Sequence, residues 1–236
     1  MDTQRLLSIA ISPLLLVPVL CLLCGCTITH EYKSKSAVKV YREYDSIYLG
    51  KTDKEEEFRL VFCMNLESCR QYDFFDTGKE AEVFDSLCAA HGDVGFNRVF
   101  EINDGTPVLL EVAVTPDPVF VDVVTEKDFD DSHAAGESLR DIVTCQYKPY
   151  YEYIRNDYTW RGKKIEKNFY EHVYDFLGNE TKRLSSMNED DYKLWQDVIP
   201  FRLIKKPSSP GDYPVKVTLH TEKGDVFESC IILSFD

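Results

Sequence analysis

The sequence is short of basic residues. Its 27 lysines and arginines stand against 41 aspartates and glutamates, which gives the 236-residue chain a formal net charge of −14. No stretch of the chain gathers the basic residues into a stripe. A chain this acidic is repelled by nucleic acid and by anionic lipid headgroups. We therefore expect no nucleic-acid partner.

Signatures of catalysis and of metal binding are missing as well. The chain has no Gly-x-Ser-x-Gly, no His-Glu-x-x-His, no phosphate-binding loop and no Ser-x-x-Lys with its partner motifs. The five histidines show no ligand spacing beyond Cys88-x-x-His91. Pairs of carboxylates arise by chance among so many acidic residues, so they identify no glycosidase dyad. We expect no cofactor, no resident metal and no catalytic residue, and a secreted hydrolase stays an alternative.

A long uncharged run near the start of the chain is the clearest positive feature. Residues 6–24 read LLSIAISPLLLVPVLCLLC, long enough to span a membrane, but Pro13 and Pro18 interrupt the run. Arg5 precedes it and Gly25 follows it, which is the order of a secretory signal: charge, apolar core, small residue. An uncleaved span and an ordinary signal peptide remain the alternatives.

The end of this run resembles a bacterial lipobox. Leu23, Cys24, Gly25 and Cys26 match its pattern of Leu, a small residue, Gly or Ala, and Cys. The resemblance implies cleavage after Gly25 and a diacylglycerol, with fatty chains such as palmitate, on the Cys26 thiol. Two or more such chains hold a protein at a membrane, whereas one binds marginally. Thr27 replaces the aspartate that retains enterobacterial lipoproteins in the inner membrane, so the outer membrane is favoured, on its periplasmic or its cell-surface face.

These features divide the chain into a signal peptide (1–25), a tether (26–35) and a β-rich globular domain (36–236), with an optional subdivision near 106. The domain has many aromatic residues, and strand-like runs recur at intervals of about ten residues. This pattern predicts a mainly β fold: an antiparallel β-sandwich, immunoglobulin-like or jelly-roll-like, with one or a few short helices.

Several elements can be predicted individually. Apolar residues at helical spacing predict a helix over 78–92, which ends in a glycine suited to a C-cap. Two apolar runs around an Asp-Gly turn predict a hairpin over 95–114, and the same logic predicts a second hairpin over 213–235. Aromatic residues in near alternation favour strands over 146–160 and 167–178.

Five cysteines remain after Cys26, and none forms a Cys-x-x-Cys pair. An exported protein meets oxidising conditions, so disulfides are allowed, and an odd count leaves at least one thiol free or paired between chains. Cys63 and Cys69 can bridge if a turn between them brings them close, with buried thiols as the alternative. The full set, whose connectivity stays open, is Cys63, Cys69, Cys88, Cys145 and Cys230.

The carboxyl-terminal half resembles a family of Bacteroidota lipoproteins. The residues that carry the resemblance are VDVVTEKDFDDSHAAGESLRDIV (121–143) and GDVFES (224–229). The family has no known activity to transfer, so the resemblance supports a bacterial source and the fold class only.

Two clusters of side chains are candidate sites. Four carboxylates gather around a glycine and are a weak candidate for Ca²⁺, with a solvated acidic loop as the alternative: Asp128, Asp130, Asp131 and Glu137. A dense aromatic stretch suits the stacking of sugar rings, with ordinary packing as the alternative: Tyr147, Tyr150, Tyr151, Tyr153, Tyr158 and Trp160.

Together these observations predict an outer-membrane-anchored lipoprotein that is not an enzyme but a binding or envelope-assembly protein. Its partners would be the membrane, through the lipid anchor, and envelope proteins or a glycan. A glycan-binding accessory lipoprotein and a secreted hydrolase are the alternative functions.

A Cys26→Ala variant tests the anchor. We expect it to lose the acyl mass and to leave the membrane fraction, because the lipobox then lacks the thiol that would carry the lipid chains. Intact-mass spectrometry and membrane fractionation measure both effects, and a variant that stays with the membrane at unchanged acyl mass contradicts the lipobox.

Overall fold

The computed structural model describes residues 29–64, 69–103, 111–164 and 176–236. The predicted signal peptide and Cys26 lie outside these ranges. Residues 33–100 and 109–236 form one compact unit, and residues 1–32 and 101–108 belong to another. The larger unit takes strands from both sides of position 106. None of the described helices has the length and apolar character needed to cross a membrane.

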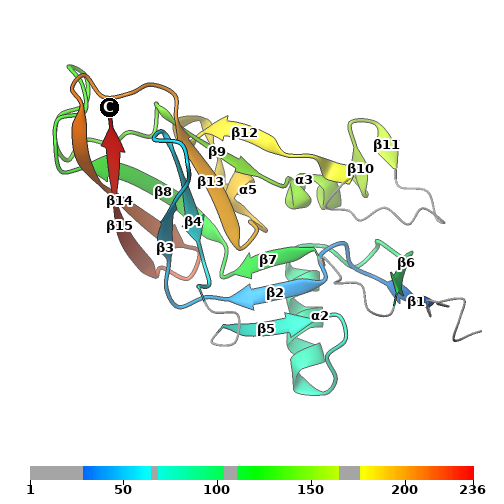
Figure 1. The fold of residues 1–236 in the computed structure, drawn as a ribbon. Coiled ribbons are helices and arrows are strands. Elements are labelled where there is room, and N and C mark those ends of the chain that lie inside the picture. The colour runs from blue at the N-terminus through cyan, green and yellow to red at the C-terminus, as the bar shows by residue number, and fades with distance from the viewer. Residues whose placement is uncertain (1–28, 65–68, 104–110, 165–175) are drawn as a thin grey trace, which may run out of the picture. The chain divides into compact units, whose positions relative to one another are not determined.

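The largest sheet has five strands in the order β12-β9-β13-β4-β3, and all neighbours are antiparallel (Figure 1). Its strands are β3 (Tyr48–Lys51), β4 (Glu57–Val61), β9 (Val143–Tyr147), β12 (Glu180–Arg183) and β13 (Val198–Leu203). A second, antiparallel sheet has the order β15-β14-β8. Its strands are β8 (Pro118–Thr125), β14 (Gly211–Thr221) and β15 (Val226–Phe235).

These two sheets enclose the larger hydrophobic core. Buried residues alternate with partly exposed ones along β14, as a strand with one face in a core requires. The buried side chains of both sheets belong to one cluster, for example Phe201 and Leu203 of β13 with Val215 and Val217 of β14. The mainly β, antiparallel, sandwich-like class is therefore confirmed, and so is the hairpin over 213–235.

A third sheet and a helix form a smaller core. The sheet has the order β5-β2-β7, in which β2 and β7 run parallel. Its elements are β2 (Val40–Glu43), β5 (Arg70–Asp73) and β7 (Val112–Thr115), with helix α2 (Lys79–Ala90). Phe84 and Cys88 of α2 are buried there with Tyr41 of β2. The predicted helix is confirmed, and it ends before Gly92, whose φ of 72° suits a residue without a side chain.

The hairpin predicted over 95–114 is wrong. Strand β6 (Arg98–Asn103) pairs with β1 (Thr29–Ser34), while β7 pairs with β2. The predicted turn at Asp104 and Gly105 lies outside the described residues. Ala113 and Val114 of β7 are completely buried, and burial of that apolar surface outweighs a local turn preference.

The strand predicted over 146–160 is also wrong as a single element. β9 ends at Tyr147, helix α3 (Tyr150–Arg155) follows, and a short strand ends the segment. Pro149 stands at the helix start, and Tyr150, Tyr153 and Ile154 are buried at helical spacing. Most of 167–178 lies outside the described residues. The remaining elements are β10 (Thr159–Trp160), β11 (Lys163–Lys164), the 3₁₀ turn η1 (Leu184–Ser186) and α5 (Glu189–Tyr192).

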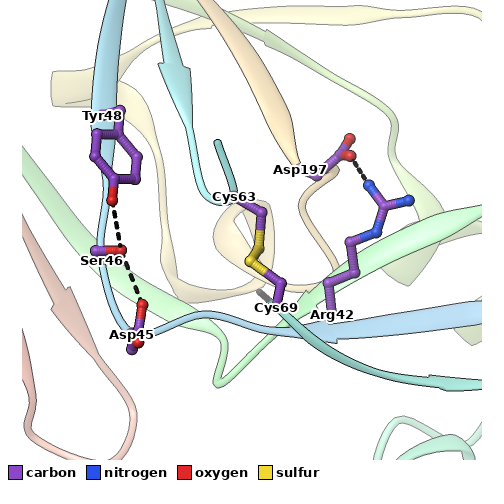
Figure 2. Close-up of a disulfide and its surroundings, with 7 residues drawn as sticks. All are labelled: Arg42, Asp45, Ser46, Tyr48, Cys63, Cys69 and Asp197. Atoms are coloured by element: carbon purple, nitrogen blue, oxygen red, sulfur yellow. Dashed lines mark hydrogen bonds and ion pairs between the residues drawn. A yellow bond between two sulfur atoms is a disulfide. The ribbon is translucent and has the colours of Figure 1, made fainter. Parts of the chain in front are cut away.

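A disulfide joins the five-stranded sheet to the sheet of the smaller core. Cys63 follows β4, Cys69 precedes β5, and the two are bonded, as Figure 2 shows. Arg42 of β2 forms an ion pair beside it with Asp197, which precedes β13. The bridge that the sequence left open is thus present. Among the cysteines that the structure describes, three are free: Cys88 and Cys145, both buried, and Cys230, which is exposed.

Removal of the disulfide by Cys63→Ser with Cys69→Ser should lower the free energy of unfolding by about 2 kcal/mol, because the unfolded chain loses a closed loop. Urea unfolding of the full-length protein measures the change. Reductant should bring the wild-type protein to the same value and leave the double variant unchanged. Equal stability of the wild-type protein with and without reductant would contradict the bond.

Candidate functional site

A cavity of about 360 Å³ lies beside α3 and α5. Helix α3 contributes an aromatic ring, an acid and a base, β12 contributes a lysine, and the segment around α5 contributes acids, a base and an amide. The lining is therefore polar and carries both signs of charge. The lining residues are Tyr147, Pro149, Tyr151, Glu152, Arg155, Asn156, Lys182, Asn188, Asp190, Asp191 and Lys193.

Asp191 organises one wall of this cavity. Its carboxylate accepts hydrogen bonds from Tyr147 Oη at 2.8 Å, from Lys182 Nζ at 2.5 Å and from the backbone N–H of Asn188 at 3.0 Å. Asn188 caps α5 in return, because its side chain accepts from the N–H of Asp190 at 3.0 Å. The Asp191 backbone carbonyl accepts from Trp195 Nε1 at 2.8 Å. The acid that caps the helix thus also fixes two lining side chains.

This network keeps Asp191 ionised. Burial alone would raise the pKa of the carboxyl, but the hydrogen bonds from Lys182, Asn188 and Tyr147 outweigh it, so the pKa is lowered. The phenol of Tyr147 has a raised pKa, because of its burial and its bond to Asp191. The wall therefore presents a fixed carboxylate and a neutral phenol across the neutral pH range.

Tyr151 is the one partly exposed ring in the cavity wall. Lys193 Nζ lies 4.4 Å from the centre of the ring, and the guanidinium carbon of Arg155 lies 5.5 Å from it. Both cations also bind Asp190, with a distance of 2.9 Å from Lys193 Nζ to Asp190 Oδ1. The bond to Asp190 raises the pKa of Lys193. The ring thus stands among charged groups that can donate and accept hydrogen bonds.

The structure buries most of the aromatic side chains that the sequence offered as a sugar platform. Five of the six have 8% of their surface exposed or less: Tyr147, Tyr150, Tyr153, Tyr158 and Trp160. Only Tyr147 and Tyr151 reach the cavity. Residues 147–160 therefore contribute mainly to the hydrophobic core and to one edge of the polar cavity, and they do not form a row of outward-facing rings.

The four acidic residues of the Ca²⁺ candidate are not brought together. Asp128 and Glu137 each accept a backbone N–H within their own loop, and Asp130 forms an ion pair with Lys205. Asp131 is exposed. Within the ranges that the structure describes, no group of three or more Asp, Glu, His or Cys side chains is arranged to hold a metal ion.

A larger cavity of about 650 Å³ lies beside α2, over Phe74, Phe84 and Cys88. Burial raises the pKa of the Cys88 thiol to about 12, so the thiol stays protonated and is a poor nucleophile. Burial also raises the pKa of Asp93, although the backbone N–H groups of Ala37 and Val38 bind its carboxylate. These buried groups hold the chain around α2, and we assign no chemistry to them.

Comparison with protein-family models, curated proteins and solved structures gave no significant match. The resemblance of residues 121–143 and 224–229 to Bacteroidota lipoproteins therefore stays a prediction, and the function is argued from the residues alone.

Two histidines form pairs with carboxylates that the sequence did not reveal. His91 Nε2 lies 2.8 Å from Asp117 Oδ2, and His91 Nδ1 lies 2.8 Å from the Leu87 carbonyl oxygen. His133 lies 2.8 Å from Asp130 and 3.0 Å from Asp141 through its two ring nitrogens. Both nitrogens of each ring thus face oxygen acceptors, and within the described part of the chain neither ring is hydrogen-bonded to a hydroxyl or thiol that could act as a nucleophile. These pairs are suited to hold a protonated imidazole in place.

Stability should therefore fall as the pH rises above neutrality. Burial lowers the pKa of each histidine, but the carboxylate bonds outweigh it, so both pKa values are raised. The stabilisation is complete below the unfolded value of about 6.5 and is lost as the pH rises through the folded pKa. The loss in the free energy of unfolding should be about 1.4 kcal/mol for each unit by which the folded pKa is raised. Urea unfolding between pH 6 and pH 9 measures it.

Variants with His91→Gln and His133→Gln provide the control, because glutamine keeps a hydrogen-bond donor without titrating. The double variant should show a flatter pH profile than the wild-type protein. A wild-type profile that is flat or rises over this range contradicts the protonated pairs.

Proposed function

We propose that this chain is a lipid-anchored, non-catalytic binding protein of the bacterial outer membrane, and that the cavity beside Tyr151 is its binding site. The observation that carries the proposal is the cavity itself, in which Lys182 is ion-paired with Asp191, and Arg155 and Lys193 are ion-paired with Asp190. The lipobox motif that ends at Cys26 supports the anchor. The disulfide between Cys63 and Cys69 supports an oxidising compartment.

A glycan is the ligand class that the lining favours. Sugar hydroxyls both donate and accept hydrogen bonds, and the cavity offers amides at Asn156 and Asn188 beside its acids and bases. Tyr151 is placed to contact an apolar sugar face at the cavity edge. One ring instead of a platform predicts a weak, mainly hydrogen-bonded interaction.

The electrostatics of Asp191 favour binding over hydrolysis. A glycosidase needs a carboxyl whose pKa is raised, so that it can donate a proton near neutral pH. Asp191 has the opposite shift, because Lys182 and Tyr147 stabilise its ionised form. The hydrogen bond between Asp191 and the N–H of Asn188 in the α5 cap also holds the carboxylate in place, so it is not free to move toward a substrate. We therefore place the secreted hydrolase behind a binding function.

Titration calorimetry with a panel of neutral and acidic oligosaccharides tests the proposal on the full-length protein in detergent. We expect one class of sugar to bind, and Tyr151→Ala to weaken that binding about tenfold, the value of a lost aromatic contact.

Tyr48→Ala is the matched control, because Tyr48 is an exposed tyrosine of β3 that does not line the cavity. It should leave the affinity unchanged. Absence of heat across the whole panel contradicts the glycan, and an equal loss in both variants contradicts the site.

A further inference from the structure

The sheet β15-β14-β8 has two edges that differ. The chain covers the outer edge of β8 with its own backbone: the Thr125 carbonyl accepts from the N–H of Gly136 at 2.7 Å, and the Val123 carbonyl accepts from the N–H of Leu139 at 2.8 Å. Among the described residues, no strand pairs with the outer edge of β15, which is ten residues long. Strand β3 of the facing sheet lies against β15 but is not hydrogen-bonded to it, so the N–H and C=O groups of the outer edge have no strand partner among the described residues.

The register shows which residues of β15 face this edge. The Thr221 N–H donates to the Asp225 carbonyl at 3.0 Å, so this is a hydrogen-bonded pair at the turn of the hairpin. Such pairs alternate along an antiparallel ladder. The odd-numbered residues of β15 therefore bond to β14, and the even-numbered residues direct their N–H and C=O groups outward. They are Val226, Glu228, Cys230, Ile232 and Ser234.

The same five residues have exposed side chains. Val226 is 53% exposed and Ile232 is 50% exposed, Cys230 is a free exposed thiol, and Glu228 is the only charge among them. Natural edge strands are usually protected by lysine, proline or a bulge. β15 has none of these along its outer edge, so it is a template for another strand.

We propose that β15 pairs antiparallel with β15 of a second copy of this chain, around a two-fold axis beside Cys230. In this register Cys230 faces the partner's Cys230, and Glu228 faces the partner's Ile232. All five outward-facing residues are then paired and no acid opposes an acid. Moving the two-fold axis by one residue in either direction leaves an outward-facing residue unpaired. A two-fold axis at Glu228 would place two carboxylates opposite each other.

The geometry of the strand pair brings the two thiols within reach of each other. Directly opposed residues of a hydrogen-bonded antiparallel pair have Cα atoms about 5.5 Å apart, inside the range of disulfides. This interface does not involve the cavity beside Tyr151, so its test is independent of the proposed ligand.

Charge variants at position 232 test the register. With reductant present, we expect the full-length protein in detergent to dimerise. Ile232→Glu should raise the dissociation constant at least about fivefold, because the new glutamate of each copy then faces Glu228 of the other copy. Ile232→Lys should keep or strengthen the dimer, because it opposes lysine to Glu228. Sedimentation equilibrium measures the constants, and circular dichroism checks that both variants fold.

Covalent trapping gives the second measurement. Oxidised glutathione can take up the two protons and two electrons of the two Cys230 thiols and leave as two reduced molecules, with a disulfide formed between the chains. Cys230→Ser should abolish the trapped dimer and keep the reversible one.

Three outcomes overturn the proposal. One is a protein that stays monomeric at about 100 µM, because its dissociation constant would then be too weak for a specific interface. In that case β15 would be available to a strand of another protein. The second is equal weakening by Ile232→Glu and Ile232→Lys. The third is an unaltered trapped dimer in Cys230→Ser.

Discussion

The smaller core is held to the sandwich by a buried carboxylate, that of Asp117. It stands between two prolines at the start of β8, with 3% of its surface exposed. Its oxygens accept from the N–H of Leu194 at 3.0 Å and bind His91 at 2.8 Å. A buried carboxylate without partners costs several kcal/mol. This contact therefore fixes the relative positions of three segments: the end of α2, the segment before β13 and the start of β8. The polar cavity is built beside these segments.

In the cavity, too, a single carboxylate connects several elements. Asp191 caps α5, binds Lys182 of β12 and orients Tyr147 of β9, so one side chain serves a helix, a strand and a cavity wall. Charged groups held in this way lose little freedom when a ligand arrives, which is the advantage of a preformed site. The more exposed lining side chains, Glu152, Arg155 and Asn156 among them, are the ones that a ligand can still rearrange.

Local patterns predicted the elements whose partners are close in the sequence. The helix over 78–92 and the hairpin over 213–235 follow from spacing and turn residues, and both are present. The hairpin over 95–114 failed because β7 is recruited by β2, a choice set by burial and not by its turn. Tyr147 and Tyr151 were named as site residues, but Lys182, Asp190 and Asp191 were not, because charged residues far from the aromatic stretch carry no signal until the fold brings them beside it. No sequence pattern marks Asp117, between its two prolines, as the buried partner of His91.

The long-range pairing of the strands has a consequence for how the chain folds. Val40 pairs with Val112, and Phe58 with Phe201, so neither sheet can close until distant parts of the chain have met. High contact order makes such folds slow. If the chain is exported as we propose, its precursor must stay extended in the secretion channel, and late closure of these sheets allows it to do so.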